Sequence, residues 1–268
     1  MPDTDSAVYV RSDDLYVPTA LSRGPWSAEA QHGGAPAALL AGLAEAEVND
    51  PDMFLSRLTM ELVRPVPIAP LAVATTMGRG NSVRRVELAL SHDGVVVARA
   101  IALFLRQQPL QLPTAGPAQS APMPMPAPDT CHQRFSVPGM PRVTSFYETA
   151  MDIRVAGGNV GKPGPASAWF RFARPLLEGM PISGGMGAVA ASDFGNGLSW
   201  MLPVEDYTFV NTDLTVYLHR NPVSEWVGVD SKMTVEANGV GLVRSDLYDE
   251  HGPVGIAQQN LFVRSRSS

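Results

Sequence analysis

An internal repeat is the feature of this sequence that most restricts the folds it can adopt. The segment LTMELVRPV (58–66) shares the pattern L-T-x-x-L-x-R with LTVYLHRNP (214–222), 156 positions later. The segment VARAIALFLR (97–106) is matched by GIAQQNLFVR (255–264), 158 positions later. Because the paired segments keep their order and a nearly constant spacing, the chain is predicted to use one supersecondary unit twice.

Each copy of the repeat contains the same kinds of segment. A glycine pair opens a small-residue apolar stretch, HGGAPAALLAGLAEAE (32–47) in the first copy and SGGMGAVAASDFG (183–195) in the second. Alternating, strand-like residues follow, then a turn (SHDG, 91–94; DEHG, 249–252) and the LF-x-R strand. This order indicates a glycine turn, a helix and three or four strands in each half.

The two glycine-led stretches predict buried helices over residues 33–48 and 184–192. Alanine and leucine cover much of the circumference of the first, which is typical of an enclosed helix. Small side chains would let a sheet approach both helices; they are Ala35, Ala37, Ala38, Ala188, Ala190 and Ala191. Strands are predicted near residues 7–19 (a strand or hairpin), 55–63, 71–78, 83–90, 95–106, 145–155, 167–173, 207–219, 227–237, 240–248 and 254–264. The expected fold is α+β, with a long antiparallel sheet wrapped around one helix in each half.

A proline-rich segment separates the two copies. QQPLQLPTAGPAQSAPMPMPAPDTCHQRFSVPGMPRV (107–143) contains prolines that block both helix and central strand. Such segments favour extended conformations and act as semi-stiff spacers. We therefore divide the chain into an N-terminal repeat (1–106), a linker crossing the surface (107–143) and a C-terminal repeat (144–268).

Composition excludes several classes of protein. Of the 268 residues, 45% are hydrophobic and 17% are charged, which allows a substantial core and argues against a disordered chain. A net charge of −6 without a basic cluster argues against a nucleic-acid partner. No apolar run is long enough for a membrane span, and the acidic N-terminus lacks signal-peptide features. With Cys131 as the single cysteine, these features predict a cytoplasmic protein without an intrachain disulfide.

The arrangement resembles the hotdog fold in its fused, double form, and is most similar to the acyl-CoA thioesterase II family and related thioesterase-like proteins. The resemblance covers nearly the whole chain outside the linker. In the first half it rests on GPWSAEAQHGG, LTMELVRPVP and HDGVVVARAIALFLR. In the second half it rests on AASDFGNG, NTDLTVYLHR and IAQQNLFVR.

The resemblance also implies a site and an activity. In that family an Asp just past the second helix, a Ser or Thr on the following strand and a Gln on the last strand hold a water that attacks the thioester carbonyl. By position the Asp corresponds to Asp193 and the Gln to Gln259. The hydroxyl position falls on Asn211, which departs from the family's pattern. The implied function is hydrolysis of acyl-CoA to a free acid and coenzyme A, without a metal or other cofactor.

The alternation of the last strand draws attention to Gln259 independently of the resemblance. Gln259 shares a strand face with Leu261 and Val263, and we expect this face to look toward the helix and core. The same is expected of its aligned counterpart, Ile101. A buried amide whose hydrogen bonds are unmade costs about 1–3 kcal/mol, so Gln259 needs a polar partner or a held water.

Asp193 and Asn211 are the candidate partners of Gln259. In the alignment Asn211 falls on Leu55 and Asp193 falls near Ala41, so the second copy replaces apolar or small residues by polar ones. This asymmetry predicts one active centre per chain. Two alternatives stay open: a glutamine of the last strand can lie at a solvated sheet edge, and an Asp after a helix is often a turn residue, where the helix dipole does not favour an anion.

Hydrolysis of a thioester also needs hydrogen-bond donors for the developing oxyanion. His32, Gly33 and Gly34 open the first helix, and backbone N–H groups at a helix start can supply such donors. We expect this segment at the acyl-CoA site, with Asp193 as general base and with Asn211 and Gln259 orienting the water. The alternative for His32 is a turn or cap residue.

Two rival functions stay open. A non-catalytic acyl-thioester binding protein would keep the acyl slot without the hydroxyl, as at Asn211, and a hydratase or dehydratase would pair His32 with a carboxylate. Arg64 and Arg220 occupy equivalent repeat positions and are either structural or contacts for coenzyme A phosphates. Double hotdogs commonly pair through their outer sheet faces, so we expect a homo-oligomer, a dimer or tetramer of double units.

Overall fold

The computed structural model describes residues 6–78, 80–111, 123–136 and 142–266. The N-terminal half contains β1 (Tyr9–Ser12), β2 (Leu15–Pro18), α1 (Gly34–Val48), β3 (Met53–Leu62), β4 (Leu71–Gly78), β5 (Val83–His92) and β6 (Val95–Arg106). The C-terminal half contains β7 (Met151–Gly158), β8 (Ala166–Phe172), α2 (Gly184–Ser192), α3 (Gly195–Leu198), β9 (Tyr207–Asn211), β10 (Asp213–Leu218), β11 (Val227–Val235), β12 (Val240–Asp249) and β13 (Gly252–Ser265). A 3-10 helix over Ala20–Ser22 lies between β2 and α1. A second 3-10 helix over Pro128–Thr130 and a π-helix over Phe146–Ala150 lie between β6 and β7.

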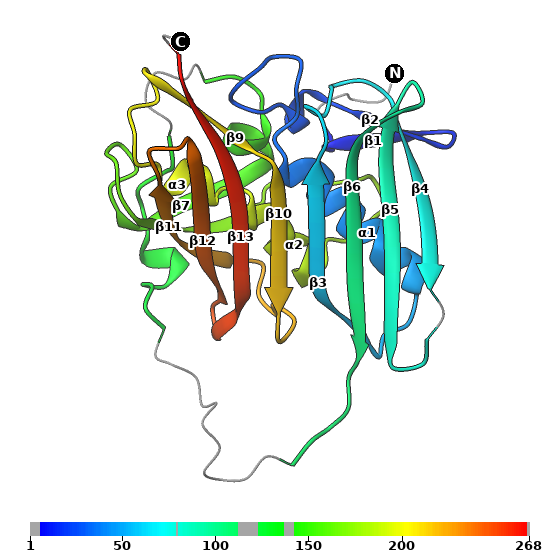
Figure 1. The fold of residues 1–268 in the computed structure, drawn as a ribbon. Helices are drawn as coiled ribbons and strands as arrows, with labels where there is room; N and C mark the ends of the chain where they lie inside the picture. The colour runs from blue at the N-terminus through cyan, green and yellow to red at the C-terminus, as the bar shows by residue number, and fades with distance from the viewer. Residues whose placement is uncertain (1–5, 79, 112–122, 137–141, 267–268) are drawn as a thin grey trace.

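One antiparallel sheet, thirteen-stranded in the described part of the chain, runs through both halves (Figure 1). Its order is β1-β2-β4-β5-β6-β3-β10-β13-β12-β11-β8-β7, and β9 also pairs with β13. Strands β3 and β10, one from each half, join the sheet at its middle. The predicted α+β arrangement of two antiparallel units, each with a central helix, is confirmed, and the two units share one continuous sheet.

The two copies of L-T-x-x-L-x-R meet at this junction. Thr59 of β3 lies opposite Thr215 of β10, and their hydroxyl oxygens are 3.4 Å apart. Because each threonine holds the same place in its copy, a pseudo-twofold axis passes between them. The antiparallel pairing also brings the end of β3 beside the start of β10, where the Leu62 N–H donates to the Thr212 carbonyl oxygen at 2.9 Å.

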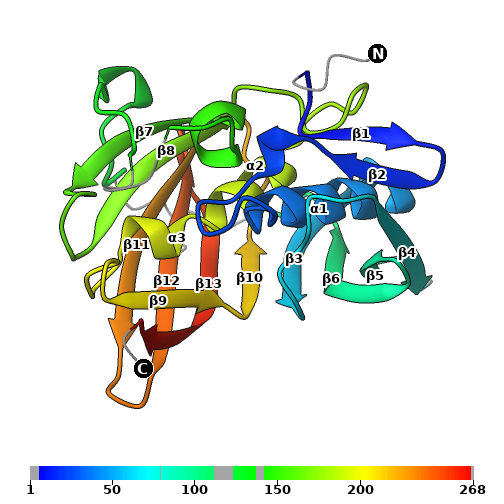
Figure 2. The ribbon, with the colours of Figure 1, turned by 90° about the horizontal axis from the view of Figure 1, so that it is seen from above.

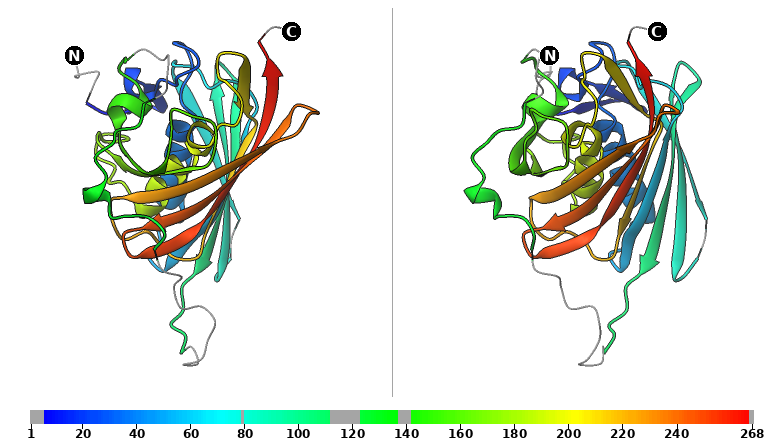
Figure 3. Two further views of the ribbon diagram at one scale, coloured as in Figure 1. Left: turned by 90° about the vertical axis from the view of Figure 1, so that its left-hand side faces the viewer. Right: turned by 60° about the vertical axis from the view of Figure 1, so that its left-hand side comes forward.

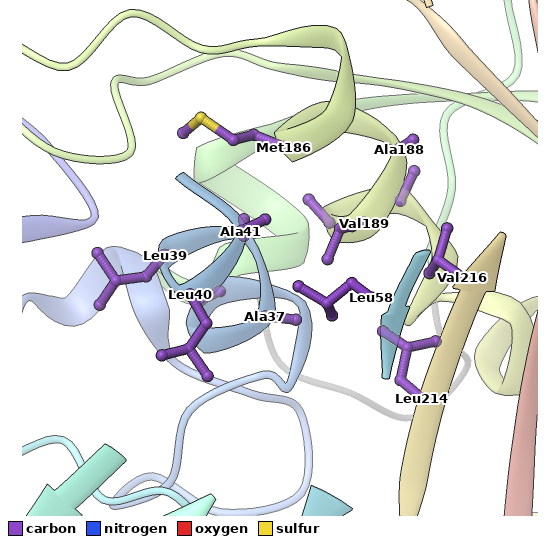
Figure 4. Close-up of a cluster of buried hydrophobic side chains, with 14 of the residues drawn as sticks. Ala37, Leu39, Leu40, Ala41, Leu58, Met186, Ala188, Val189, Leu214 and Val216 are labelled. Atoms are coloured by element: carbon purple, nitrogen blue, oxygen red, sulfur yellow. The ribbon is translucent and has the colours of Figure 1, made fainter. Parts of the chain in front are cut away.

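Helices α1 and α2 lie next to each other on one side of the curved sheet (Figures 2 and 3). Most residues of α1 are buried, as its apolar circumference predicts. Asn49, in the left-handed conformation (φ 41°), caps the C-terminal end of α1. Ser183 caps the start of α2, where its hydroxyl accepts a hydrogen bond from the Met186 N–H at 3.0 Å. Side chains from both helices, β3 and β10 form the centre of the core (Figure 4), including Ala37, Leu40, Leu58, Val189, Leu214 and Val216.

Small residues set the distance between the two helices. A methyl group added at Gly34 would lie 2.7 Å from the carbonyl oxygen of Ala190, so the first turn of α1 contacts the backbone of α2. Ala37, Ala38 and Ala188 are fully buried. The small side chains of both helices therefore allow the close packing that the sequence predicts.

Two predicted strands have a different structure. Residues 146–150 form a π-helix where the start of a strand was expected; Ser145 caps it by accepting a hydrogen bond from the Glu148 N–H at 3.3 Å. The strand expected over 207–219 is interrupted at Thr212, which separates β9 from β10. β9 then pairs with β13 alone. Alternating sequence does not reveal either change, because both depend on contacts with distant segments.

The alignment of the last strands was wrong by one residue. Ile101 is 40% exposed on the outer face of the sheet, whereas Gln259 is 1% exposed on the inner face. Leu58 pairs with Ala102 in the first half, and continuing the β10–β13 register places its counterpart, Leu214, opposite Gln259. The structural counterpart of Gln259 is therefore the fully buried Ala102, because a slip of one residue moves a side chain to the other face.

Residues 123–136, part of the proline-rich segment, pack against β7 and β8. The indole N–H of Trp169 donates to the Pro126 carbonyl oxygen at 2.8 Å, and the Val155 N–H donates to the Gln133 carbonyl oxygen at 2.8 Å. A small buried cluster lies beneath this stretch, formed by Met125, Cys131, Trp169 and Trp226. Positions 112–122 and 137–141 of the predicted linker lie outside the described residues.

Candidate functional site

Asp193 lies where the two helices meet. It caps the C-terminal end of α2 and is 6% exposed. A methyl group added at Gly33, the residue that precedes α1, would lie 2.9 Å from its Oδ2, so the carboxylate touches the first turn of α1. A carboxylate at the C-terminal end of its own helix is disfavoured by that dipole, but here the positive N-terminal end of α1 offsets the effect.

Two side-chain amides of the C-terminal half donate hydrogen bonds to this carboxylate. Asn211 Nδ2, at the end of β9, is 3.0 Å from Asp193 Oδ1, and Gln259 Nε2, on β13, is 3.0 Å from the same oxygen. The structure thus brings together the three residues singled out in the sequence. Gln259 lies in the interior and not at a solvated edge, and Asp193 makes more contacts than a turn residue needs.

The N-terminal half has apolar residues at the places of both amides. Ala102 is the counterpart of Gln259. Leu55 is the counterpart of Asn211, because β3 pairs Leu55 with Phe104 as β9 pairs Asn211 with Leu261. Since Leu55 is 2% exposed, an apolar side chain is buried in the first half where the second half has a side-chain amide.

A fourth polar side chain at the site, Asn196 of α3, was not predicted. Its Nδ2 donates to Asn211 Oδ1 at 3.0 Å, and the residue is 6% exposed. Because the Asn211 amide nitrogen donates to the Asp193 carboxylate, the amide oxygen points the other way and accepts from Asn196. Asn196 belongs to the segment ASDFGNG. Its side chain reaches β9 only because residues 195–198 form the short helix α3, which no periodicity in the sequence indicates.

His32 contacts the second oxygen of the carboxylate. Its Nδ1 is 2.9 Å from Asp193 Oδ2 and 3.1 Å from the backbone nitrogen of Gly34. Nδ1 cannot donate to Asp193 and accept from Gly34 at once. We assign the Nδ1 proton to the bond with Asp193, because a carboxylate oxygen can only accept and the 2.9 Å contact needs a donor. The ring stacks on Phe194 at 4.3 Å and lies 5.4 Å from Phe146, so both aromatics fix its orientation.

A cavity of about 490 Å³ opens beside these side chains. The loop before α1, the segment after β3, α3 and β9 form its walls. His32, Gly33, Asp193, Asn196 and Asn211 line it, and most of the remaining lining residues are apolar or aromatic. The arrangement offers a carboxylate, side-chain amides and a helix N-terminus to a ligand whose remainder is apolar.

Gln259 stands behind Asp193 and is not among the described residues that line the cavity. Its Oε1 is buried and has no hydrogen-bond partner within the described part of the chain. A methyl group added at Gly195 would lie 3.2 Å from this oxygen. Such an orphaned acceptor is costly, which is typical of a group kept for something other than stability.

The pseudo-twofold axis relates this site to a second carboxylate, Glu45, near the other end of α1. A methyl group added at Gly185, in the first turn of α2, would lie 2.7 Å from Glu45 Oε1. Burial raises the pKa of the Glu45 carboxyl above its ordinary value, and a hydrogen bond from Ser183 acts in the opposite direction. Each helix start therefore faces a carboxylate of the other helix. Near Glu45, however, stands Leu55, the apolar counterpart of Asn211, whose Cδ2 lies 3.3 Å from the same added methyl group.

Arg220, one of the two arginines that the sequence offered as contacts for coenzyme A, has a structural role. Arg220 makes an ion pair with Asp249, at 2.5 and 2.6 Å. Among the described residues, no group of three His, Cys, Asp or Glu side chains is placed to hold a metal ion. In the same residues, no helix has the length and apolar character that crossing a membrane requires.

Two family models match the chain. A model of the acyl-CoA thioesterase C-terminal domain matches residues 117–263, and a model of the acyl-CoA thioesterase N-terminal domain matches residues 22–105. A search of curated protein sequences found no match.

Solved structures with the same architecture cover almost the whole chain. A hot dog fold protein of unknown function from Alicyclobacillus acidocaldarius has 17% identity and a TM-score of 0.69, with 98% of each chain covered. The acyl-CoA thioesterase II TesB2 from Mycobacterium marinum has 15% identity and a TM-score of 0.61, covering 99% of this chain and 98% of that one. The dehydratase domain of the polyketide PpsC from Mycobacterium tuberculosis has 15% identity and a TM-score of 0.51, covering 98% and 99%. At these identities the similarity establishes the fold, which is the double hotdog.

Proposed function

Because the chain belongs to the acyl-CoA thioesterase family, we propose that it hydrolyses acyl-CoA thioesters to a free carboxylic acid and coenzyme A. The C-terminal domain model of that family alone matches more than half of the chain. The observation that carries the proposal is the convergence of Asn211 and Gln259 on the Asp193 carboxylate at the wall of a largely apolar cavity.

In the proposed reaction, Asp193 acts as general base toward a water molecule in the cavity. The water oxygen attacks the thioester carbonyl carbon while one of its protons passes to the carboxylate. The tetrahedral intermediate then collapses, the C–S bond breaks, and the departing thiolate receives a proton from Asp193. The products are the acid and the free thiol of coenzyme A, and Asp193 returns to its starting state.

The amides have different parts in this proposal. Asn211 lines the cavity and has a second N–H with which to hold the water oxygen. Gln259 is a positioning residue, since it reaches the reaction only through Asp193 Oδ1. Asn196 is a positioning residue as well, because its hydrogen bond fixes which way the Asn211 amide points.

The first turn of α1 is the proposed oxyanion site. Gly33 lines the cavity beside Asp193, and its N–H has no partner among the described residues. The Gly34 N–H faces Nδ1 of His32 at 3.1 Å, and Gly34 is not among the described residues that line the cavity, so the Gly33 N–H is the donor assigned to the oxyanion. Backbone donors at a helix N-terminus are fixed before the reaction begins, so they stabilise developing negative charge without reorganising.

The acyl group would occupy the apolar part of the cavity. The residues that form this part are Trp26, Leu62, Val63, Phe135, Tyr147, Phe194, Trp200, Val204, Phe209 and Val210. Such a lining accepts straight-chain and aromatic acyl groups alike.

The direct test is release of thiol from a panel of straight-chain and aromatic acyl-CoAs by the purified protein. We expect release from at least one member, above the rate without protein. Saturable binding across the panel without any thiol release would instead identify an acyl-thioester binding protein.

A hydratase or dehydratase is the second candidate, because His32 and Asp193 form the histidine–carboxylate pair that such chemistry uses. An enoyl-CoA would then lose the absorbance of its conjugated double bond without releasing thiol. For hydrolysis we expect the reverse: thiol is released, and saturated acyl-CoAs, which offer no double bond, are equally good substrates.

Replacing Asn211 by threonine is expected to keep kcat within about tenfold of the parent, because a hydroxyl can also hold a water. Asn211→Leu, which copies the first half, is expected to lower kcat by about 10²-fold, on the scale of losing one preorganised donor. Thiol release at saturating substrate measures both. Equal rates for the leucine and threonine variants would show that Asn211 does not hold the water.

Replacing Gly33 by alanine is expected to lower kcat by about tenfold or more, since the new methyl group pushes on Asp193 and small displacements of a reacting group are costly. The control is Gly197→Ala at the same cavity, where the nearest atom is Phe135 Cζ at 3.8 Å. Thiol release and melting temperature are compared for both. A Gly33 variant as active as the control would remove this contact from the account.

We also propose that the protein forms a homo-oligomer through the outer face of its sheet. Exposed apolar side chains of β6, β10 and β12 lie on that face: Ile101, Tyr217 and Leu242. Sedimentation should give a mass at least twice that of one chain; a monomer at micromolar concentration would contradict this.

A further inference from the structure

We propose that Arg64 and Arg266 form a subsite that binds the phosphate groups of coenzyme A at the same cavity. The inference rests on the proposed thioesterase function and adds to it the residues that recognise the anionic part of the substrate. The arginines lie on segments far apart in sequence, one just after β3 and one just after β13.

The cavity has few charged groups, and the two arginines are its only lysine or arginine residues among the described lining. Both are exposed, so a phosphate can reach them without a change of structure. The chain as a whole carries a net charge of −6, which repels an anion such as coenzyme A. A local pair of positive charges is therefore needed to draw the anion to this opening.

The repeat shows that Arg64 is not simply structural. Its counterpart, Arg220, is occupied by Asp249 and by the carbonyl oxygens of Gly252 and Pro253. In the first half His92 stands at the place of Asp249, because it pairs with Val95 at the β5–β6 turn as Asp249 pairs with Gly252 at the β12–β13 turn. Within the described residues, no hydrogen bond or ion pair uses the guanidinium of Arg64.

The antiparallel junction explains why the unpaired arginine is at the site. The end of β3 lies beside the start of β10, as the bond between Leu62 and Thr212 shows, so Arg64 follows β3 into the wall of the cavity close to Asn211. The end of β10 lies beside the start of β3 instead, since Ser56 donates to the Leu218 carbonyl oxygen. Arg220 is therefore on the Glu45 side of the pseudo-twofold axis, where it forms its ion pair.

Arg266 is held in place while part of its side chain stays available. Its backbone N–H donates to the Asp206 carbonyl oxygen at 2.7 Å, and its Nε donates to the Val204 carbonyl oxygen at 3.0 Å. The two terminal nitrogens make no hydrogen bond or ion pair within the described residues. A guanidinium anchored through Nε presents two parallel donors, which match the oxygens of a phosphate.

The test compares one acyl group on two carriers, coenzyme A and N-acetylcysteamine, which has no phosphates. Arg64→Gln and Arg266→Gln should each lower kcat/KM for acyl-CoA by about tenfold, mainly through KM, as loss of a charge-assisted hydrogen bond implies. The N-acetylcysteamine ester should be hydrolysed as by the parent. Arg174→Gln is the control and should change neither value, because Arg174 is exposed, follows β8 and does not line the described cavity.

Equal losses on both carriers, or no loss on coenzyme A, would overturn the subsite. If the parent releases no thiol from either carrier, the proposed function fails by that result, and the subsite is then decided by calorimetry with coenzyme A alone. Binding by the parent that weakens about tenfold in each variant supports the subsite. Binding that is absent, or equal in parent and variants, overturns it.

Discussion

Replacement of Asp193 by asparagine is expected to lower kcat for thiol release by about 10²–10⁴-fold, the usual contribution of a general base. Asparagine has nearly the same shape as aspartate, but its amide cannot accept the proton of the attacking water. The side chain is buried between α1 and α2, so a change of shape would disturb the helix contact, whereas a change of charge mainly affects the chemistry. Thiol release at saturating acyl-CoA measures the loss.

A matched control for this variant is Asp230→Asn. Asp230 is a half-buried carboxylate on β11 that does not line the described cavity, and burial beside Asp246 raises its pKa. Its replacement should leave kcat unchanged. Circular dichroism should report a folded protein for both variants. A fully active, folded Asp193→Asn protein would remove this carboxylate from the reaction.

Replacement of Gln259 by leucine is expected to lower kcat by about 10²-fold, because Asp193 loses a donor that fixes its orientation and preorganised donors are worth about that much. Gln258→Leu is the control: it lies on the same strand, one residue away, and its side chain is exposed on the opposite face. It should retain parental activity. If both leucine variants were equally active, Gln259 would have no part in positioning Asp193.

The same substitution separates function from stability. Gln259→Leu removes one hydrogen bond to a carboxylate, which costs about 1.5–3 kcal/mol, but it also removes an orphaned acceptor of comparable cost. The free energy of unfolding in urea should therefore stay within about 1–2 kcal/mol of the parent. A loss of activity together with near-parental stability would mark Gln259 as retained for function.

The architecture can be predicted from the sequence because both copies of the repeat have the same order of segments: a glycine pair, an apolar stretch of small residues and alternating strands. Apolar, small-residue stretches after a glycine pair can be accommodated only as enclosed helices, and the structure buries Ala37 and Ala190 fully. Alternation then predicts most of the strands. The π-helix at 146–150 and the break at Thr212 could not be predicted, since neither changes the local pattern of apolar residues.

The site could be predicted only in part. Asp193 and Gln259 followed from the family resemblance, and comparison of the two halves showed that polar groups had replaced apolar ones. The comparison used the wrong partner, Ile101, because aligning LFLR with LFVR sets the two strands 158 positions apart. The strand pairing sets them 157 apart, since Thr59 lies opposite Ile101 and its counterpart Thr215 lies opposite Gln258. Ala102 is the true counterpart. The second half therefore has a buried amide side chain at a place where the first half has only a methyl group.

Asn196 and the contact of His32 with Asp193 needed the structure. Asn196 belongs to a helix of one turn, too short to show periodicity. His32 is 161 positions from Asp193, and only the packing of α1 against α2 brings them to 2.9 Å. A contact between residues on two packed helices is not visible in a single sequence. The only indication is the presence of small residues that allow the two helices to pack closely.

The pseudo-twofold arrangement explains why one chain is expected to have one active centre. Both helix starts face a carboxylate, Asp193 or Glu45, which satisfies the dipoles of α1 and α2 alike. Amides surround the first carboxylate, whereas Leu55 and Ala102 lie at the equivalent places near the second. The carboxylate is thus common to both halves, and the amides distinguish the site.

The measurement that tests the central claim most directly is single-turnover hydrolysis of a good acyl-CoA in ¹⁸O-water, with both the acid and the protein analysed by mass spectrometry. If Asp193 activates a water, the released acid carries one ¹⁸O and the protein carries none. If the acid emerges unlabelled and the ¹⁸O appears in the Asp193 carboxylate, the carboxylate attacked the thioester itself, and the account of a water held in this site is wrong.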